Sequence, residues 1–305
     1  MAQCQPLLTR LIASSVTVSS QAGKIIRDIF TRGELNIIDK GVNDIQTEAD
    51  RSAQNCIIES LSRQFPDVTI IGEEGPSRCE VPPEWIITDM DQEVLKVKLP
   101  NYLENISPKD VCVWVDPLDG TSEYAQGLVN HITVLIGIAV GSKAVGGVIH
   151  QPYYESKETS SLGRTMWAIE GVGVGGFKPI LPPVGKRIIT TTRSHSNKTV
   201  QAALDALKPD EILRVGGAGH KVVLLLEGKA HAYIFASRGC KRWDTCAPEA
   251  ILHAAGGTMT DFWGEKYAYD ANTDYLNAKG ILATAPGEQH SWYISNIPDE
   301  VKQEI

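Results

Sequence analysis

The central stretch of the sequence reads Val111-Cys112-Val113-Trp114-Val115-Asp116-Pro117-Leu118-Asp119-Gly120-Thr121. Its first five residues favour a strand, because β-branched and aromatic side chains fit a pleated surface. Pro117 then fixes one backbone angle, and Gly120 permits a tight reversal. The stretch therefore predicts a strand that ends in a turn carrying two carboxylates.

The two carboxylates of this turn, Asp116 and Asp119, are close enough to repel each other, so one would hold its proton unless a positive charge lies nearby. A divalent cation supplies that charge, and oxygen ligands select Mg²⁺ or a similar hard ion. The Leu118 carbonyl, exposed by the turn, could add a further oxygen. The carboxylates of an aspartate-rich turn can also serve only as hydrogen-bond acceptors for the backbone of the turn. Evidence from the rest of the chain is needed to choose between these interpretations.

The composition limits the classes of function. The chain has 305 residues, of which 42% are hydrophobic and 22% charged, and its net charge is -8. This length suits two modest domains or one large layered domain. The acidic balance argues against a nucleic-acid binder, because affinity for a phosphate backbone comes from clustered Lys and Arg. The negative net charge is still compatible with the binding of a small phosphorylated ligand if metal ions supply local positive charge.

The six cysteines show neither zinc-ligand spacing nor the density of a disulfide scaffold, which predicts reduced thiols in a cytoplasmic protein. The longest nearly apolar run, Ile132 to Val140, is far too short to span a bilayer. The N-terminus lacks the regions of a signal peptide. We therefore expect no membrane association and, because no coiled-coil pattern is visible, a monomer.

The first half of the chain predicts two helices and a set of strands. Apolar residues recur at helical spacing from Leu7 to Phe30, with Gly33 as the stop, and Thr47 can cap a second helix that runs to about Gln64. Strands are expected at 68–72, 132–140, 144–149 and 165–169, the second and third antiparallel. The region between Pro76 and Asp110 is expected to be a variable surface region with one short helix.

A glycine-rich segment follows the last of these strands. Residues 171–176 satisfy the pattern G-x-G-x-x-G, but a Pro-rich segment follows instead of the helix that would hold a pyrophosphate. We interpret the segment as a turn between strands. The Pro-rich segment, which runs to Gly185, is the expected boundary between an N-terminal α+β domain (1–184) and a C-terminal α/β domain (185–305).

The second half predicts alternating strands and helices. Strands are expected at 187–192, 212–215, 232–235 and 280–284, and helices at about 198–207, 220–226 and 245–255. This α/β organisation places loops at the carboxyl ends of strands, where ligands tend to bind.

Three acidic elements occur in the order G-E-E, with Glu73 and Glu74, then D-P-L-D-G-T at 116–121, then W-D with Asp244. This order resembles the lithium-sensitive, magnesium-dependent phosphatase superfamily of inositol monophosphatases. The resemblance runs nearly end to end and implies an inositol-monophosphatase-like αβαβα sandwich. It is closest to the 3'(2'),5'-bisphosphate nucleotidases, because T-T-T-R-S-H-S-N-K at 190–198 and V-G-G-A-G-H-K at 215–221 look like their nucleotide-binding segments, and W-D-T-C-A-P-E-A at 243–250 departs from monophosphatase usage.

The resemblance also implies roles for individual residues. Two or three Mg²⁺ ions would be held by five residues: Glu73, Asp116, Leu118 through its carbonyl, Asp119 and Asp244. The nucleotide would be contacted by four: Thr192, His195, Gly217 and Lys221. Asp50 and Thr121 match the pair that activates water.

Plainer interpretations exist for several of these residues. Thr121 cannot be a base alone, so its hydroxyl should relay a proton to Asp50, yet a carboxylate in the first turn of a helix can also only stabilise the helix dipole. His195 can merely cap a helix and Lys221 can be solvated, although the glycine-rich loop before Lys221 favours contact with an anion. The basic residues at 238, 241 and 242 are left outside the predicted site.

We therefore expect a magnesium-dependent phosphatase that converts adenosine 3',5'-bisphosphate to AMP and phosphate. The resemblance implies similar action on 3'-phosphoadenylyl sulfate and on the 1-phosphate of inositol 1,4-bisphosphate, and inhibition by Li⁺. One alternative is an inositol-phosphate phosphatase with little activity on nucleotides. Another is a non-catalytic sensor of a phosphorylated metabolite, against which the intact pair of Asp50 and Thr121 argues.

Overall fold

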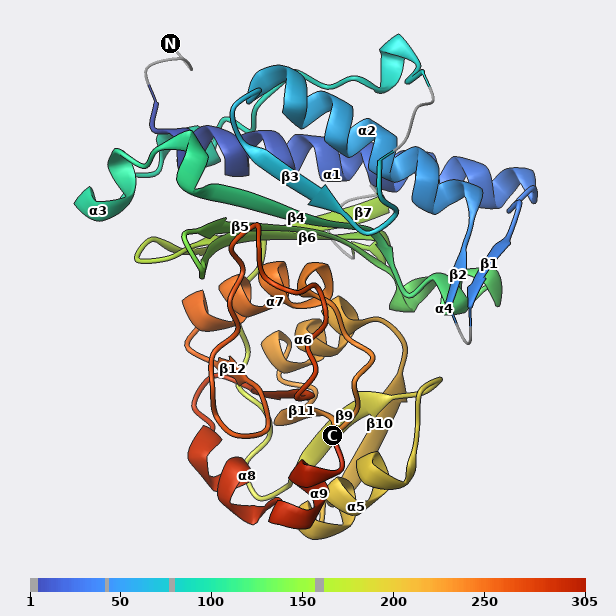
Figure 1. The fold of residues 1–305 in the computed structure, drawn as a ribbon, viewed down its shortest axis with the longest axis vertical. Coiled ribbons are helices and arrows are strands. Elements are labelled where there is room, and N and C mark those ends of the chain that lie inside the picture. Colours follow the sequence, from blue (N-terminus) through green and yellow to red (C-terminus); the bar gives the residue numbers. More distant parts are fainter. Residues whose placement is uncertain (1–4, 42–43, 77–79, 157–161) are drawn as a thin grey trace.

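Helices and sheets alternate in five layers in the computed structural model (Figure 1), which describes residues 5–41, 44–76, 80–156 and 162–305. Helices α1 (Leu7–Arg32) and α2 (Glu48–Gln64) form the first layer and cover one face of a six-stranded sheet. Helices α6 (Ala218–Leu226) and α7 (Arg242–Ala254) lie between this sheet and a second one. The αβαβα sandwich that the resemblance implies is confirmed.

The first sheet has the strand order β3-β4-β5-β6-β7-β8. Strand β3 is parallel to β4, and every other neighbouring pair is antiparallel. The predicted strands are present, and β6 extends further than expected. The glycine-rich segment begins in the turn after β7 and forms β8 itself. The bounds are β3 Thr69–Gly72, β4 Val111–Asp119, β5 Thr133–Val140, β6 Lys143–Glu155, β7 Leu162–Ile169 and β8 Gly173–Gly175.

Both helices of the first layer begin and end where the sequence predicts. Gly33 ends α1 with a φ of 77°, a conformation that glycine adopts without strain. Thr47 caps α2 by accepting a hydrogen bond from the Ala49 amide, and it shares a capping box with Asp50. Before α2, strands β1 (Ile38–Gly41) and β2 (Asp44–Gln46) form an antiparallel pair. This pair was not predicted, because its mostly exposed residues lack an apolar face.

The region from 76 to 110 contains one short α-helix, as expected, together with 3₁₀ turns. The helix is α3 (Asn101–Glu104), and residues 77–79 lie outside the described residues. The 3₁₀ turns here are η2 (Pro83–Trp85), η3 (Val94–Lys96) and η4 (Pro108–Asp110). After the central turn, α4 (Thr121–Ala125) and η5 (Val129–His131) lead into β5.

The second sheet has the order β10-β9-β11-β13-β12. Strand β9 is parallel to both β10 and β11, so the carboxyl ends of these three strands share one edge. Strand β13 is antiparallel to β11 and β12. The bounds are β9 Ile188–Thr192, β10 Glu211–Val215, β11 Ala232–Phe235, β12 Thr258–Thr260 and β13 Ile281–Thr284.

The last layer covers the outer face of the second sheet. It consists of α5 (Lys198–Leu207), α8 (His290–Asn296) and α9 (Asp299–Gln303), of which only α5 was predicted (Figure 1). The first sheet uses residues 69–175 and the second 188–284, and the domain boundary at 184 stays a prediction. Among the described helices, none is long and apolar enough to cross a bilayer.

Helix α7 approaches the first sheet unusually closely. A Cβ atom at Gly137 would lie 2.5 Å from the Cβ of Cys246, and one at Gly147 would lie 2.6 Å from the carbonyl oxygen of Ala247. Glycine on β5 and β6 therefore lets α7 rest against the sheet backbone. The predicted start of α7 near Thr245 is wrong: the helix begins at Arg242, because the Lys241 amide donates a 2.6 Å hydrogen bond to Asp244 Oδ2 and caps the first turn.

Candidate active site

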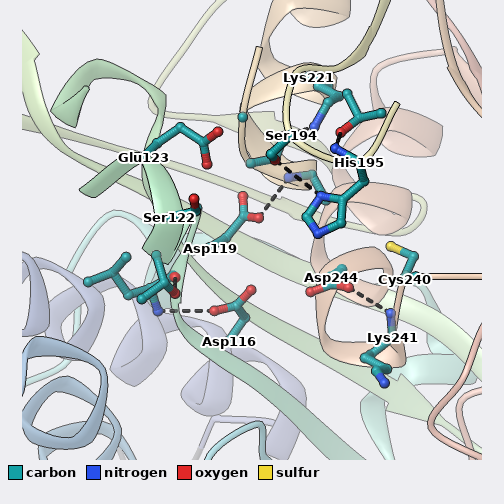
Figure 2. Close-up of a pocket in the computed structure, with 18 of the residues that line it drawn as sticks. Asp116, Asp119, Ser122, Glu123, Ser194, His195, Lys221, Cys240, Lys241 and Asp244 are labelled. Atoms are coloured by element: carbon teal, nitrogen blue, oxygen red, sulfur yellow. Dashed lines mark hydrogen bonds between the residues drawn. The ribbon is translucent and has the colours of Figure 1, made fainter. Parts of the chain in front are cut away.

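Three aspartates converge where α7 meets the end of β4. Carboxylate oxygens of Asp116, Asp119 and Asp244 all lie within 4.8 Å of one another (Figure 2). Asp116 and Asp119 come from the end of β4, and Asp244 from the first turn of α7. Asp116 and Asp119 are buried, with 2% and 6% of their surface exposed. Two distant parts of the chain thus place their carboxylates at one point.

The charges of this cluster are not balanced within it. Burial raises the pKa of Asp116 well above its usual range, and repulsion from Glu73, Asp119 and Asp244 raises it further. Burial together with repulsion from Asp119 raises the pKa of Asp244 to about 6. Buried carboxylates with converging oxygens suit a hard divalent cation. The residues present therefore fit Mg²⁺.

Glu73 joins the cluster from the neighbouring strand. It follows β3, and its amide donates a 3.0 Å hydrogen bond to the Val115 carbonyl oxygen of β4. Its pKa is raised well above the usual range by burial and by repulsion from Asp244. Glu74 instead accepts hydrogen bonds from Lys40 and Gln46. Of the acidic pair, Glu73 is the member that lines the pocket with the aspartates.

The irregular end of β4 also holds Leu118 in place. The Leu118 amide donates a 3.0 Å hydrogen bond to Asp116 Oδ1. Its carbonyl oxygen lies 3.1 Å from the Thr121 hydroxyl. The two backbone groups of Leu118 therefore connect Asp116 with Thr121.

Thr121 and Asp50 form a hydrogen-bonded pair beside the cluster. Thr121 Oγ1 lies 2.9 Å from Asp50 Oδ1, and Asp50 Oδ2 accepts hydrogen bonds from the Thr47 amide and hydroxyl. Burial raises the pKa of Asp50 to about 6, although these hydrogen bonds counteract the rise. Asp50 therefore completes the helix cap and also contacts Thr121, so the two interpretations of its position are compatible.

Asp119 lies at the N-terminus of α6. Its Oδ1 accepts a 2.7 Å hydrogen bond from the Ala218 amide, and its Oδ2 accepts bonds from the Gly219 amide at 2.8 Å and the Thr133 hydroxyl at 2.7 Å. Figure 2 shows the contact with α6 as a dashed line. Burial raises the pKa of Asp119, and Thr133, Lys221 and the two amides counteract this rise. A carboxylate has about four acceptor positions, so a ligand position remains.

Lys221 and Gly217 belong to the same helix end. Lys221 is 5% exposed, and its Nζ donates a 2.8 Å hydrogen bond to the Gly217 carbonyl oxygen. Burial lowers the pKa of Lys221, and the charge of Asp119 counteracts this effect. Gly217 has a φ of 72°, and a Cβ there would lie 2.6 Å from the His131 carbonyl oxygen. Only glycine fits this position without a shift of the backbone.

Thr192 is the last residue of β9, and His195 follows it in the next loop. The His195 amide donates a 3.0 Å hydrogen bond to Thr192 Oγ1, and the His195 ring lies against the Ser194 hydroxyl at 3.1 Å. The segment with Gly217 follows the parallel strand β10. Both predicted nucleotide segments therefore lie at one edge of the second sheet, as the α/β pattern predicts.

One pocket of about 350 Å³ gathers ten of the eleven predicted site residues. Asp50 is the exception, because it is fully buried beside Thr121. The ten are Glu73, Asp116, Leu118, Asp119, Thr121, Thr192, His195, Gly217, Lys221 and Asp244.

Sequence reasoning missed several residues that line this pocket. Tyr233 and Phe235 lie two positions apart at the end of β11, so they share one face of that strand. The rule that ligands bind at the carboxyl ends of parallel strands could have found them. Ser122 and Glu123 follow Thr121 directly in α4. Of the basic residues left outside the site, Lys241 does line the pocket.

A family profile and the sequences of known proteins match this chain over nearly its whole length. The profile described as "Inositol monophosphatase family" matches residues 7–302. The "3'(2'),5'-bisphosphate nucleotidase 1" of Homo sapiens is 48% identical over 308 residues, which cover 100% of this chain and 99% of that protein. The protein of the same name from Dictyostelium discoideum is 38% identical, over 92% of this chain and 94% of that protein.

A solved structure with the same fold has a much more distant sequence. The extragenic suppressor protein suhB from Bartonella henselae has a TM-score of 0.69 and is 21% identical in sequence. The superposition covers 97% of this chain and 99% of that chain. At this identity the match supports the layered fold alone.

Proposed function

Because the chain belongs to the inositol monophosphatase family, we propose that its pocket binds adenosine 3',5'-bisphosphate and hydrolyses the 3'-phosphate to give AMP and phosphate. As a member of this family with bisphosphate nucleotidases among its relatives, the chain is a phosphatase. The observation that carries the proposed substrate is the single pocket in which the acidic cluster meets both predicted nucleotide segments.

The acidic side of the pocket would hold Mg²⁺, with two or three ions on Glu73, Asp116, the Leu118 carbonyl, Asp119 and Asp244. When bound, such ions neutralise the charge of the phosphate oxygens and make a water molecule more acidic. The cluster itself contributes a rigid, buried set of oxygen atoms, because Asp119 is fixed by α6 and Asp244 by the cap of α7.

Thr121 and Asp50 would take the proton of the attacking water. Thr121 Oγ1 accepts that proton while its own proton moves to Asp50 Oδ1, which lies 2.9 Å away. The pKa of about 6 leaves Asp50 mostly ionised at neutral pH and able to accept it. The water oxygen bonds to phosphorus as the bond from phosphorus to the 3'-oxygen breaks, and the 3'-oxygen takes a proton from solvent.

The nucleoside part would bind along the edge of the second sheet, next to Asp119 and the start of α6. Thr192, His195, Gly217 and Lys221 lie there, and Tyr233 and Phe235 add aromatic surface. A nucleotide extends further from the reacting phosphate than an inositol ring, so it can use the edge of the second sheet. The same pocket would accept 3'-phosphoadenylyl sulfate and inositol 1,4-bisphosphate, and Li⁺ would inhibit by competing at the acidic cluster.

The decisive experiment measures phosphate release from adenosine 3',5'-bisphosphate with Mg²⁺, with EDTA, and with Mg²⁺ plus Li⁺. Inositol 1-phosphate serves as the parallel substrate, and Asp116→Asn as the variant that should be inactive. We expect release from the nucleotide that requires Mg²⁺ and is suppressed by Li⁺. Release mainly from the inositol ester would replace the substrate but keep the chemistry. Tight binding of the nucleotide without product would indicate a sensor.

The proposal includes a cytoplasmic, monomeric protein. Four described cysteines are buried free thiols, namely Cys56, Cys112, Cys240 and Cys246, which supports a reducing compartment. Cys4 and Cys79 lie outside the described residues. Light scattering after gel filtration would give the mass in solution, and a mass near 66 kDa, twice the 33.2 kDa of one chain, would contradict the monomer.

A further inference from the structure

Arg193 connects the predicted nucleotide segment to helix α4. It lies between Thr192 and Ser194, and its amide donates a 3.2 Å hydrogen bond to the Val215 carbonyl oxygen. Both terminal nitrogens of its guanidinium donate to Gln126 Oε1, each at 3.1 Å. One of them also lies 3.6 Å from Glu123 Oε1. The side chain therefore bridges the end of β9 and the helix that begins at Thr121.

Glu123 is a buried acidic partner in this bridge. Its side chain is 3% exposed, and among the described residues no donor makes a hydrogen bond to its Oε1. An ionised carboxylate at such a position needs a positive charge nearby. Arg193 supplies one at 3.6 Å. Arg193 therefore neutralises the buried Glu123 together with Lys221, whose charge also interacts with this carboxylate.

Glu123 also contacts the second nucleotide segment. A Cβ atom at Gly216 would lie 2.0 Å from the carboxyl carbon of Glu123, so the carboxylate rests on the backbone before Gly217. In Figure 2 Glu123 lies on one side of the pocket, and Ser194, His195 and Lys221 lie across from it. One acidic side chain therefore touches both segments that follow β9 and β10.

We infer that Arg193 is a positioning residue which, through Glu123 and Gln126, fixes the segment carrying Thr192 and His195 relative to α4. These three residues are called the Arg193 clasp below. Because α4 begins at Thr121, the clasp sets the separation between the water-activating pair and the nucleotide side of the pocket. The inference rests on the proposed function, in which Thr192 and His195 contact the nucleotide.

The geometry suits arginine and not lysine. A guanidinium is planar and can direct two N–H groups at one oxygen while a third interaction reaches a carboxylate. An ammonium group is a point charge on a flexible chain, so it can neutralise Glu123 but cannot hold Gln126 in the same way. Arg193→Lys therefore separates the charge of the clasp from its rigidity.

The test combines kinetics with hydrogen exchange on the ligand-free protein. In Arg193→Met and Gln126→Leu we expect faster exchange of the amides at 192–197, which include the bonded amides of Arg193 and His195. In Arg193→Met the KM for adenosine 3',5'-bisphosphate should rise about tenfold, the loss expected for hydrogen bonds from a charged group, while kcat changes little. Arg193→Lys should give an intermediate KM. The KM for inositol 1,4-bisphosphate, which the proposed function also includes and which has no nucleoside part, should not change.

Arg63→Met is the matched control, because Arg63 forms an exposed ion pair with Glu59 at 2.7 Å on α2. Its exchange and kinetics should equal those of the unmodified protein. A double-mutant cycle with Glu123→Gln should show that this change adds little to Arg193→Met, since both remove the same interaction.

Two results would overturn the inference. The first is unchanged exchange at 192–197 in both Arg193→Met and Gln126→Leu, which means that the clasp fixes nothing. The second is an unchanged KM for the nucleotide, or an equal loss of kcat on both substrates, which means that the clasp does not act on nucleotide binding. If Arg193→Met does not fold, Gln126→Leu and Arg193→Lys give the same readouts. Absence of phosphatase activity in the unmodified protein would instead refute the proposed function, and the exchange result would stand separately.

Discussion

The carboxylate of Asp119 accepts a 2.7 Å hydrogen bond from the amide of Ala218, which fixes the end of β4 to the first turn of α6. The favourable N-terminal end of a helix thereby stabilises a carboxylate that we also propose as a Mg²⁺ ligand. A change at Asp119 should therefore affect the acidic cluster and the segment with Gly217 together.

Thr133 tests this connection without altering Asp119 itself. Thr133→Val removes the 2.7 Å hydrogen bond to Asp119 Oδ2 and leaves a buried carboxylate with one donor fewer. We expect the free energy of unfolding to fall by about 1–3 kcal/mol. Urea unfolding measures this loss, and Thr69→Val, at an exposed threonine that begins β3, is the control. Equal stability of the two variants would argue against a supporting role for Thr133.

Thr121 should matter for turnover more than for binding. Thr121→Ala removes the hydroxyl that lies 2.9 Å from Asp50. We expect kcat to fall about 100-fold or more with KM within about twofold, as for the loss of a proton-transfer group. Steady-state kinetics check this, and Thr121→Ser should keep most of the activity because it retains the hydroxyl. A Thr121→Ala protein with normal kcat would remove the pair from the mechanism.

Asp116→Asn should have opposite effects with and without Mg²⁺. In EDTA the variant loses one of several buried charges that repel one another, so it should be more stable than the unmodified protein. A gain of about 1 kcal/mol would raise Tm by about 2 °C in a chain of this size. With Mg²⁺ the unmodified protein should gain stability and the variant should not. Thermal unfolding in EDTA and with Mg²⁺ measures both effects. Asp110→Asn, a change at an exposed aspartate, is the control.

Glu249, which does not line the pocket, should make the stability of the protein depend on pH. It is buried, it accepts a 2.5 Å hydrogen bond from Tyr269, and burial raises its pKa to about 7. The unfolded chain loses this proton at a lower pH, near the ordinary glutamate pKa of 4.5, so ionisation favours unfolding. Stability should therefore fall as pH rises from about 4.5 to about 7, by about 3 kcal/mol in total.

Glu249→Gln should remove that dependence. The variant should exceed the unmodified protein in stability above pH 7, and the difference should shrink towards pH 4.5. Denaturant unfolding between pH 4.5 and pH 7 measures this difference in stability. Glu211→Gln, a change at an exposed glutamate, is the control. A constant difference at every pH would show that Glu249 does not titrate as the structure indicates.

The elements that sequence predicts well are those with a strong apolar pattern and a local stop. Helix α1 repeats apolar residues along its length and ends at Gly33, and β5 is nearly continuous in apolar residues. Most residues of strands β1 and β2 are exposed, and α8 and α9 are only seven and five residues long, so no apolar pattern identifies these elements. The sequence does not reveal the start of α7, because Asp244 is both an acidic residue of the cluster and the side chain that caps this helix.

The predicted site consists of residues that carry motifs, and the missed residues reach the pocket through packing. Glu73, Asp116 and Asp244 are visible as acidic groups at the ends of elements. Thr133 is an ordinary strand residue until β5 places its hydroxyl beside Asp119. The role of Glu123 likewise becomes apparent only when the segment with Gly216 packs against it. Contacts between distant segments cannot be obtained from local patterns.

The packing of α7 on β5 and β6 also limits which sequence changes the protein can tolerate. Alanine at position 137 or 147 would be a mild change by chemistry, yet it would push α7 away from the sheet and displace Asp244 with it. Such a mutation would inactivate the enzyme although neither glycine lines the pocket. At 137 the obstacles include the backbone nitrogen of Ala247 at 2.6 Å, and at 147 they include its carbonyl oxygen at 2.6 Å, so no side-chain change in α7 could restore the fit at either position.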